Sequence, residues 1–144
     1  MNTIQLDKNF FFGGRATFTV DNGKGTHYTF RISTPKHPYG LFKPYFASLL
    51  TGTDNETSYT YLGSVSTATG DIIMTRASKM NSDSVPVKVL TWILKKVIGE
   101  NFELPEGYSV QHAGKCGCCG RTLTHPESLK NGIGPECIKK FGLS

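Results

Sequence analysis

The sequence predicts an α+β fold in which one long helix packs on an antiparallel sheet and a small zinc-ribbon or treble-clef-like module follows. Apolar and polar residues alternate through much of residues 14–76, one later segment has helical periodicity, and all four cysteines lie between residues 116 and 137. The alternating segments are joined by connections too short for helical crossovers, so the strands should pair antiparallel. A chain of 144 residues has room for a domain of about a hundred residues and a small appendage.

The first predicted structure is a β-hairpin. Residues 14–20 and 26–32 alternate, and the Asp-Asn-Gly-Lys-Gly sequence between them is rich in residues that accept left-handed backbone angles. Three further strands are predicted at residues 45–50, 59–65 and 71–76. An aromatic run, Phe10 to Phe12, precedes the hairpin, and at least one of its rings should be buried.

One strong helix is predicted over residues 85–100. Ser84 is the expected N-cap, Pro86 lies in the first turn, and Gly99 marks the end. The apolar residues share one broad face that should cover one side of the sheet: Val87, Leu90, Ile93, Leu94, Val97 and Ile98.

Trp92, the only tryptophan, is predicted to lie on the opposite arc of this helix. Its neighbours there are Lys88, Lys95 and Lys96. A tryptophan among lysines suits stacking on a nucleic-acid base or anchoring a protein interface. The alternative is that the C-terminal module packs over it.

A surface linker at residues 101–107 is the predicted domain boundary. The sheet-plus-helix domain then spans 1–107, and the zinc-binding module spans 108–144, starting with a strand-like run at 108–111. Residues 112–144 carry five basic residues against two acidic ones, so this module is the most basic part of the chain for its length.

The predicted metal ligands are three cysteines and a histidine. Cys116 and Cys119 form a C-x-x-C pair followed by glycine, which is typical of a zinc knuckle. Cys137 follows Gly-Pro-Glu, so it should lie in the first turn of a short helix, where the helix dipole favours a thiolate. His112, four residues before Cys116, is the favoured fourth ligand.

Other fourth ligands remain open. His125, Cys118 or a water molecule could complete the shell in place of His112. A closed set of four protein ligands would make the zinc structural. An iron–sulfur cluster would need the adjacent Cys118 and Cys119 to bind together, which is awkward, and the signatures of zinc deaminases are absent.

One part of the chain resembles a known family. The residues that carry the resemblance are Cys116, Cys119, Gly120, Arg121, Leu123, Thr124, Pro126, Glu127, Ser128, Leu129, Gly132, Ile133, Gly134, Pro135 and Cys137. They resemble small zinc-knuckle domains of unassigned function found in proteins of bacteriophages, other mobile elements and bacteria. The resemblance implies metal binding by Cys116, Cys119 and Cys137, often with an upstream histidine such as His112, and a phage or mobile-element origin. Cys118 departs from the pattern.

Charge and segment patterns suggest where the protein acts. The net charge of +5 makes nucleic acid a candidate partner. No segment has the apolar length of a membrane helix, and the N-terminus lacks the pattern of a signal peptide. We therefore expect a cytoplasmic protein, in the bacterial host if phage-encoded, with no membrane partner.

The preferred function is non-enzymatic binding of nucleic acid or a nucleoprotein complex. Besides the surface around Trp92, it would use the basic residues of the module: Lys115, Arg121, Lys130, Lys139 and Lys140. Arg121 could equally hydrogen-bond carbonyl groups beside the knuckle. The alternative is a protein that inhibits or modifies a host enzyme or defence complex. An enzyme is disfavoured because the sequence has no nucleophile elbow, phosphate-binding glycine loop or carboxylate pair, and His27 and His37 have no evident partner.

Overall fold

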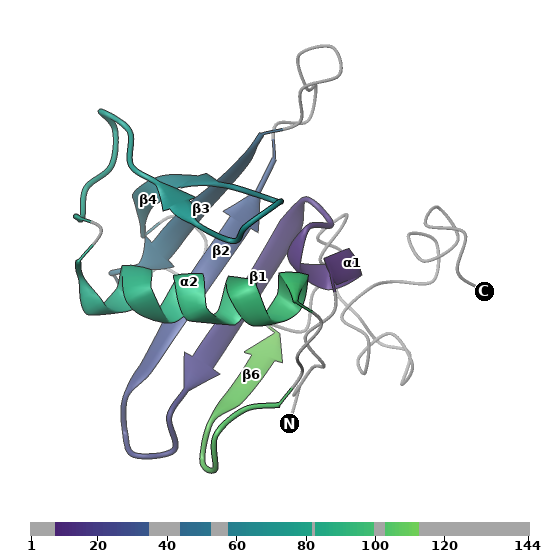
Figure 1. Ribbon diagram of the computed structural model, residues 1–144. Coiled ribbons are helices and arrows are strands. Elements are labelled where there is room, and N and C mark those ends of the chain that lie inside the picture. The colour runs from purple at the N-terminus through teal and green to yellow at the C-terminus, as the bar shows by residue number, and fades with distance from the viewer. Residues whose placement is uncertain (1–7, 35–43, 53–57, 82, 100–102, 113–144) are drawn as a thin grey trace.

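A computed structural model describes residues 8–34, 44–52, 58–81, 83–99 and 103–112. They form one antiparallel sheet with a long helix across one face (Figure 1). The strand order is β5-β4-β3-β2-β1-β6. The elements in chain order are α1 (Lys8–Phe11), β1 (Arg15–Asp21), β2 (His27–Ser33), β3 (Tyr45–Leu50), β4 (Tyr59–Val65), β5 (Ile72–Ile73), α2 (Val85–Ile98) and β6 (Ser109–His112). The α+β prediction of a helix packed on an antiparallel sheet is confirmed.

The predicted hairpin is β1 and β2, paired from Arg15↔Ser33 to Asp21↔His27. Its turn is held by side chains that accept from nearby backbone amides. Asp21 Oδ1 accepts from the amide of Gly23 at 2.7 Å. Gly23 itself has φ +76°, a left-handed angle that favours glycine.

The three other predicted strands are present, and two have the predicted bounds. β3 and β4 cover residues 45–50 and 59–65 as expected, with a register shift between Ala47 and Ser48. β5 is shorter than predicted because the chain turns away after Ile73. The hydroxyl of Ser78 accepts from the amide of Thr75 at 2.9 Å, which closes a turn where a strand was expected.

A sixth strand completes the sheet. The strand-like run that the sequence places at the start of the zinc module becomes β6, which pairs with β1 from Phe18↔His112 to Asp21↔Ser109. The sheet therefore has six strands rather than about five, and β1 is an inner strand.

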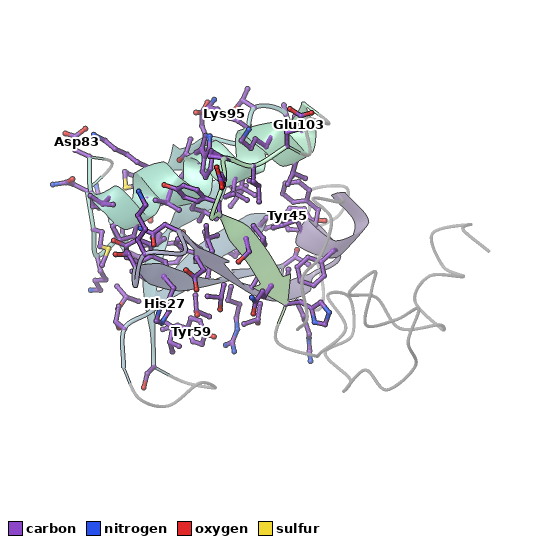
Figure 2. All side chains as sticks on the ribbon, turned by 90° about the horizontal axis from the view of Figure 1, so that it is seen from below. His27, Tyr45, Tyr59, Asp83, Lys95 and Glu103 are labelled. Atoms are coloured by element: carbon purple, nitrogen blue, oxygen red, sulfur yellow. The ribbon has the colours of Figure 1, made fainter. Side chains whose placement is uncertain are left out.

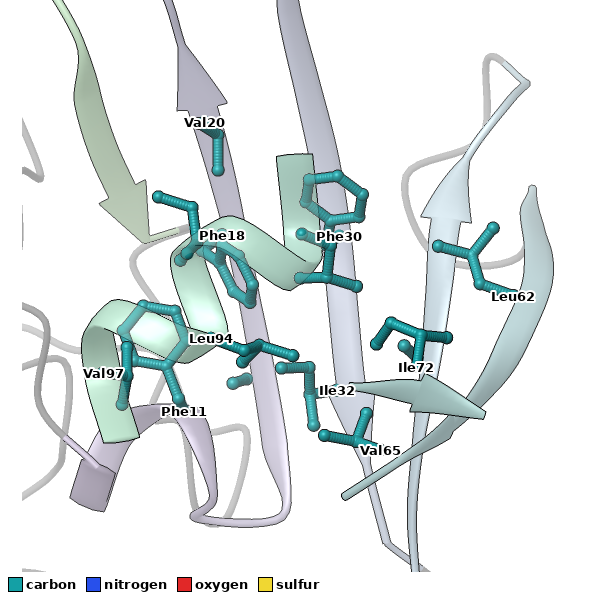
Figure 3. Close-up of a cluster of buried hydrophobic side chains, with 14 of the residues drawn as sticks. Phe11, Phe18, Val20, Phe30, Ile32, Leu62, Val65, Ile72, Leu94 and Val97 are labelled. Atoms are coloured by element: carbon teal, nitrogen blue, oxygen red, sulfur yellow. The ribbon is translucent and has the colours of Figure 1, made fainter. Parts of the chain in front are cut away.

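The core lies between α2 and the sheet face that it covers (Figure 3). Val87, Leu90, Ile93, Leu94 and Val97 are buried as the helical pattern predicts. The sheet contributes Ala16, Phe18, Val20, Phe30, Ile32, Tyr45, Ala47, Leu49, Leu62, Val65, Ile72 and Val110. From the aromatic run, Phe10 and Phe11 are fully buried, and the carbonyl of Phe12 accepts from the Tyr45 hydroxyl at 2.8 Å. The prediction of at least one buried ring is confirmed.

The ends of α2 differ slightly from the prediction. Ser84 occupies the N-cap position, but its side chain makes no capping hydrogen bond. Its hydroxyl instead donates to the carbonyl of Asn81 at 2.9 Å, so the local turn competes with the cap. The helix ends at Ile98, and Gly99 follows at its C-cap. No helix in the described part of the chain has the length and apolar character needed to span a membrane.

Candidate nucleic-acid interface and metal ligands

Trp92 and Tyr108 form an aromatic pair on one side of α2. Their ring centroids are 5.3 Å apart and the ring planes are inclined at 71°, an edge-on contact. Trp92 is half-buried and borders the core, so it lies on the flank of α2 rather than on an arc opposite the apolar face. Tyr108 reaches it from a turn in which its amide donates to the carbonyl of Pro105 at 3.1 Å. A residue of the 108–144 segment thus covers part of the indole.

The three lysines around Trp92 have different roles. Lys96 Nζ lies 5.3 Å from the centroid of the Trp92 ring, within the range of a cation–π contact. Lys95 Nζ lies 3.0 Å from the carboxylate of Asp71, in an ion pair exposed to solvent. Lys88 is exposed. Among the described residues, Lys88 and Lys96 make no ion pair, so their charges are the ones available to a polyanion. We call Lys88, Trp92, Lys96 and Tyr108 the α2 surface.

Lys95 has a structural explanation. Its ammonium group also donates to the carbonyl of Thr69 at 3.3 Å, so it ties the β4–β5 turn to the helix. The hydrogen bond from Lys95 lowers the pKa of Asp71 below its usual range, helped by the hydrogen bond from Thr69 and by the charge of Lys95. Because this charge is already matched, Lys95 is the weakest of the three lysines as a phosphate ligand. Figure 2 shows it on the helix side of the sheet.

A shallow recess of about 420 Å³ lies beside the α2 surface. It is lined by Asp71, Ile72, Val87, Lys88, Thr91, Trp92 and Lys95. The recess places the exposed Lys88 and one side of the indole on the same hollow. A flat aromatic group could enter beside Trp92 while a phosphate meets the lysine.

His112 is the one predicted zinc ligand that the structure describes. It is 4% exposed, the last residue of β6, and its ring centroid lies 6.2 Å from that of Phe10 in α1. Its side chain is therefore on the core side of the sheet, where packing limits the ring's orientation. Among the described residues, no group of three His, Cys, Asp or Glu side chains could hold a metal.

The other predicted site residues lie outside the described part of the chain. They are Cys116, Cys118, Cys119, Cys137, His125, Lys115, Arg121, Lys130, Lys139 and Lys140, and His37 lies outside it too. His27 is described and lies exposed at the start of β2.

One surface was missed at the level of sequence: the sheet face directed away from α2. There the guanidinium carbon of Arg31 lies 4.0 Å from the centroid of the Tyr59 ring. Both residues are in predicted strands, and the alternation that placed Phe30 and Ile32 in the core also sends Arg31 to the other face. The same alternation is therefore the signal in the sequence that points to this surface.

The described geometry defines the class of protein: an α+β sheet with a helix on one face and a cationic, aromatic surface on that helix. Residues 109–142 match a family described as a family of unknown function (DUF6011). The match begins at the first residue of β6 and covers the segment with the zinc-knuckle resemblance. No curated protein and no solved structure matches the chain.

Proposed function

We propose that this protein is a zinc-stabilised, non-enzymatic binding protein, encoded by a phage or mobile element, that contacts nucleic acid or a nucleoprotein complex in the bacterial cytoplasm. The observation that carries the proposal is the α2 surface, where Lys96 lies 5.3 Å from the Trp92 ring and Lys88 is exposed beside it. Lysines contact phosphates, and an indole beside them offers a stacking surface for a base.

The C-terminal segment would extend this surface. Its basic residues, Lys115, Arg121, Lys130, Lys139 and Lys140, raise the local positive charge. Tyr108, the first residue of the predicted module, packs on Trp92. We propose that the basic residues of the module add to the positive charge that a polyanion would meet.

The zinc would be held by His112, Cys116, Cys119 and Cys137. The burial of His112 beside Phe10 supports its role, because a packed imidazole presents one ring nitrogen in a fixed direction. With four protein ligands the ion would be structural and would couple the fold of the segment to the sheet through β6.

Salt-dependent binding tests the proposal. Fluorescence anisotropy of labelled oligonucleotides with the full, zinc-loaded chain should show affinity that falls steeply with salt. Changing Lys88 and Lys96 together to alanine should weaken binding to all sequences and reduce the slope of log K against log salt by about 0.7–0.9 for each phosphate that the variant no longer neutralises. Lys24→Ala, an exposed lysine in the β1–β2 turn, is the matched control. An affinity that does not change with salt concentration would contradict the proposal that the α2 surface binds nucleic acid. So would an equal loss of affinity in the control variant.

A protein partner is the second candidate, an inhibitor or modifier of a host enzyme or defence complex. It is favoured by apolar and aromatic side chains on the same helix, since Val85 at its N-terminus is 59% exposed and Trp92 carries the edge-on contact with Tyr108, and aromatic anchors dominate protein interfaces. Capture from nuclease-treated bacterial lysate separates the two. Partners that wild type retains and Trp92→Ala releases favour the protein partner; partners released by nuclease treatment favour nucleic acid.

A further inference from the structure

The sheet face directed away from α2 has a composition that the proposed function does not use. Tyr59 and His27 lie on this side, opposite Lys95 and the helix (Figure 2). We call it the distal sheet face, and the outward residues of its strands are Arg15, Thr17, Thr19, Asp21, His27, Thr29, Arg31, Ser33, Phe46, Ser48, Leu50, Tyr59, Tyr61, Ser64, Ile73, Ser109 and Gln111. The face carries aromatic rings and hydroxyl groups together with two arginines, one aspartate and one histidine.

The strand register brings the planar groups together. Arg31 on β2 pairs with Ser48 on β3, and Ser48 pairs with Tyr61 on β4. Arg31 reaches over β3 to place its guanidinium 4.0 Å from the centroid of the Tyr59 ring. Tyr59 and Tyr61 are two residues apart on one strand, so they share the face at a spacing of about 7 Å.

A second aromatic pair extends this cluster. Phe46 on β3 and Tyr61 on β4 have ring centroids 6.1 Å apart and planes inclined at 58°. Phe46, Tyr59 and Tyr61 are all half-buried, so each keeps part of its ring surface accessible. Three rings and one guanidinium thus cover neighbouring positions on β2, β3 and β4.

The outward charged residues of strands β1 to β4 are two arginines and one aspartate. Across the described strands β1 to β4, Asp21 is the one acidic residue, and it lies at the end of β1 with its carboxylate bonded to the hairpin turn. Arg15 and Arg31 supply positive charge on the same side of the sheet. Hydroxyl groups lie between them, including the Thr19 and Thr29 pair, whose oxygens are 2.7 Å apart.

We infer that the distal sheet face binds single-stranded nucleic acid, with bases stacked on Tyr59, Tyr61 and Phe46 and the backbone held by Arg31. Stacking needs unpaired bases, because the faces of bases in a duplex are already covered. The hydroxyls suit sugar and phosphate contacts, which carry no sequence information, so binding should tolerate sequence. The inference goes beyond the proposed function, because it concerns a different surface and selects single strands over duplexes.

Direct binding with aromatic variants tests the inference. The full chain is titrated into labelled single-stranded dT and rU oligonucleotides of equal length, and into a duplex. Tyr59→Leu with Tyr61→Leu should weaken single-strand binding by about 5- to 160-fold for each base that no longer stacks. Tyr28→Leu is the control, because Tyr28 is half-buried on the helix side of the sheet, where it packs near Phe30. Binding of either dT or rU supports the site, and their ratio shows which sugar it prefers.

Two further measurements keep the test decisive. If the tyrosine variants lose their far-UV circular dichroism, Phe46→Leu replaces them and should also weaken binding. Ultraviolet crosslinking of wild type to dT should label peptides from β3 and β4. Unchanged affinity in the folded variants, equal affinity for duplex, or crosslinks confined to α2 or to residues 113–144 would overturn the inference.

The proposals for the α2 surface and for the distal sheet face can be rejected independently of each other. Changing Lys88 and Lys96 to alanine tests the α2 surface and leaves Tyr59 and Tyr61 in place. Trp92, the only tryptophan, lies on the helix side and should be quenched only when the α2 surface is occupied. Single-strand affinity that survives the lysine changes but falls with the tyrosine changes supports the distal face even if the α2 surface binds nothing.

Discussion

Tyr108 packs edge-on against Trp92, with ring centroids 5.3 Å apart. The contact joins the segment that enters β6 to the helix that covers the sheet. Tyr108 remains 38% exposed, and Leu104 from the same connection packs at the border of the core. Because β6 pairs with β1 directly afterwards, the aromatic pair helps to fix where the chain joins the sheet edge.

Replacing Tyr108 by alanine should expose Trp92 and loosen this join. We expect the fluorescence of the single tryptophan to shift to longer wavelength. The unfolding free energy should fall by about 0.5–1.5 kcal/mol for the lost aromatic contact, in addition to the loss from apolar area that is no longer buried. Urea unfolding followed by tryptophan emission gives both values on one sample. Tyr59→Ala, on the other face of the sheet, should leave the emission unchanged. An unshifted spectrum in Tyr108→Ala would show that the ring contact does not shield Trp92.

Gly63 is a position where any side chain should be costly. A Cβ atom there would lie 2.6 Å from the carbonyl oxygen of Ile73 and 2.9 Å from Cγ2 of Ile72. β5 is two residues long, so it would have to shift as a whole. Gly63→Ala should cost about 1–3 kcal/mol in chemical denaturation, the usual range for overpacking. Ser64→Ala, its neighbour on the distal face, is the control, and equal stabilities for the two variants would contradict this account.

The Asp71–Lys95 ion pair predicts a small acid sensitivity. The pKa of Asp71 is lowered in the folded state, chiefly by the hydrogen bond from Lys95. Its contribution to stability is therefore present above the ordinary pKa of aspartate, about 4, and disappears as the pH falls through the lowered value. Both groups are exposed, so the effect should be slight. Carboxyl titration by NMR should show the pKa of Asp71 rising in Lys95→Met; an unchanged pKa would mean that the pair is not formed in solution.

Strand patterns made much of the sheet predictable. β3 and β4 have the bounds that the sequence predicts, because turns rich in Gly, Asn and Thr follow each of them. The buried face of α2 followed from its helical period, apart from Ile98, which is half-buried. Where side-chain hydrogen bonds decide the conformation, prediction was weaker: Ser78 ends β5 early, and Ser84 bonds to Asn81 instead of capping α2.

Contacts between distant segments were the part that sequence could not supply. Nothing local shows that residues 109–112 pair with β1, since that depends on which sheet edge the chain reaches after α2. The contact between Arg31 on β2 and Tyr59 on β4 likewise depends on the strand order, in which only β3 separates their two strands. Helical spacing predicts the lysines around Trp92. It does not predict that Lys95 forms an ion pair with Asp71, because Asp71 lies far away in the sequence.

Zinc removal should affect the C-terminal segment and spare the core. The described core is closed by apolar contacts between α2 and the sheet, and the described residues hold no group of three His, Cys, Asp or Glu side chains that could bind a metal. We expect purified protein to carry zinc, and chelation to leave the emission of Trp92 largely unchanged while nucleic-acid binding weakens. Cys116→Ser, Cys119→Ser and Cys137→Ser should lower the zinc content measured by mass spectrometry. Cys118→Ser and His125→Ala are the controls and should retain the metal. Loss of zinc in either control, with zinc retained in His112→Ala, would transfer the fourth ligand position from His112 to that residue.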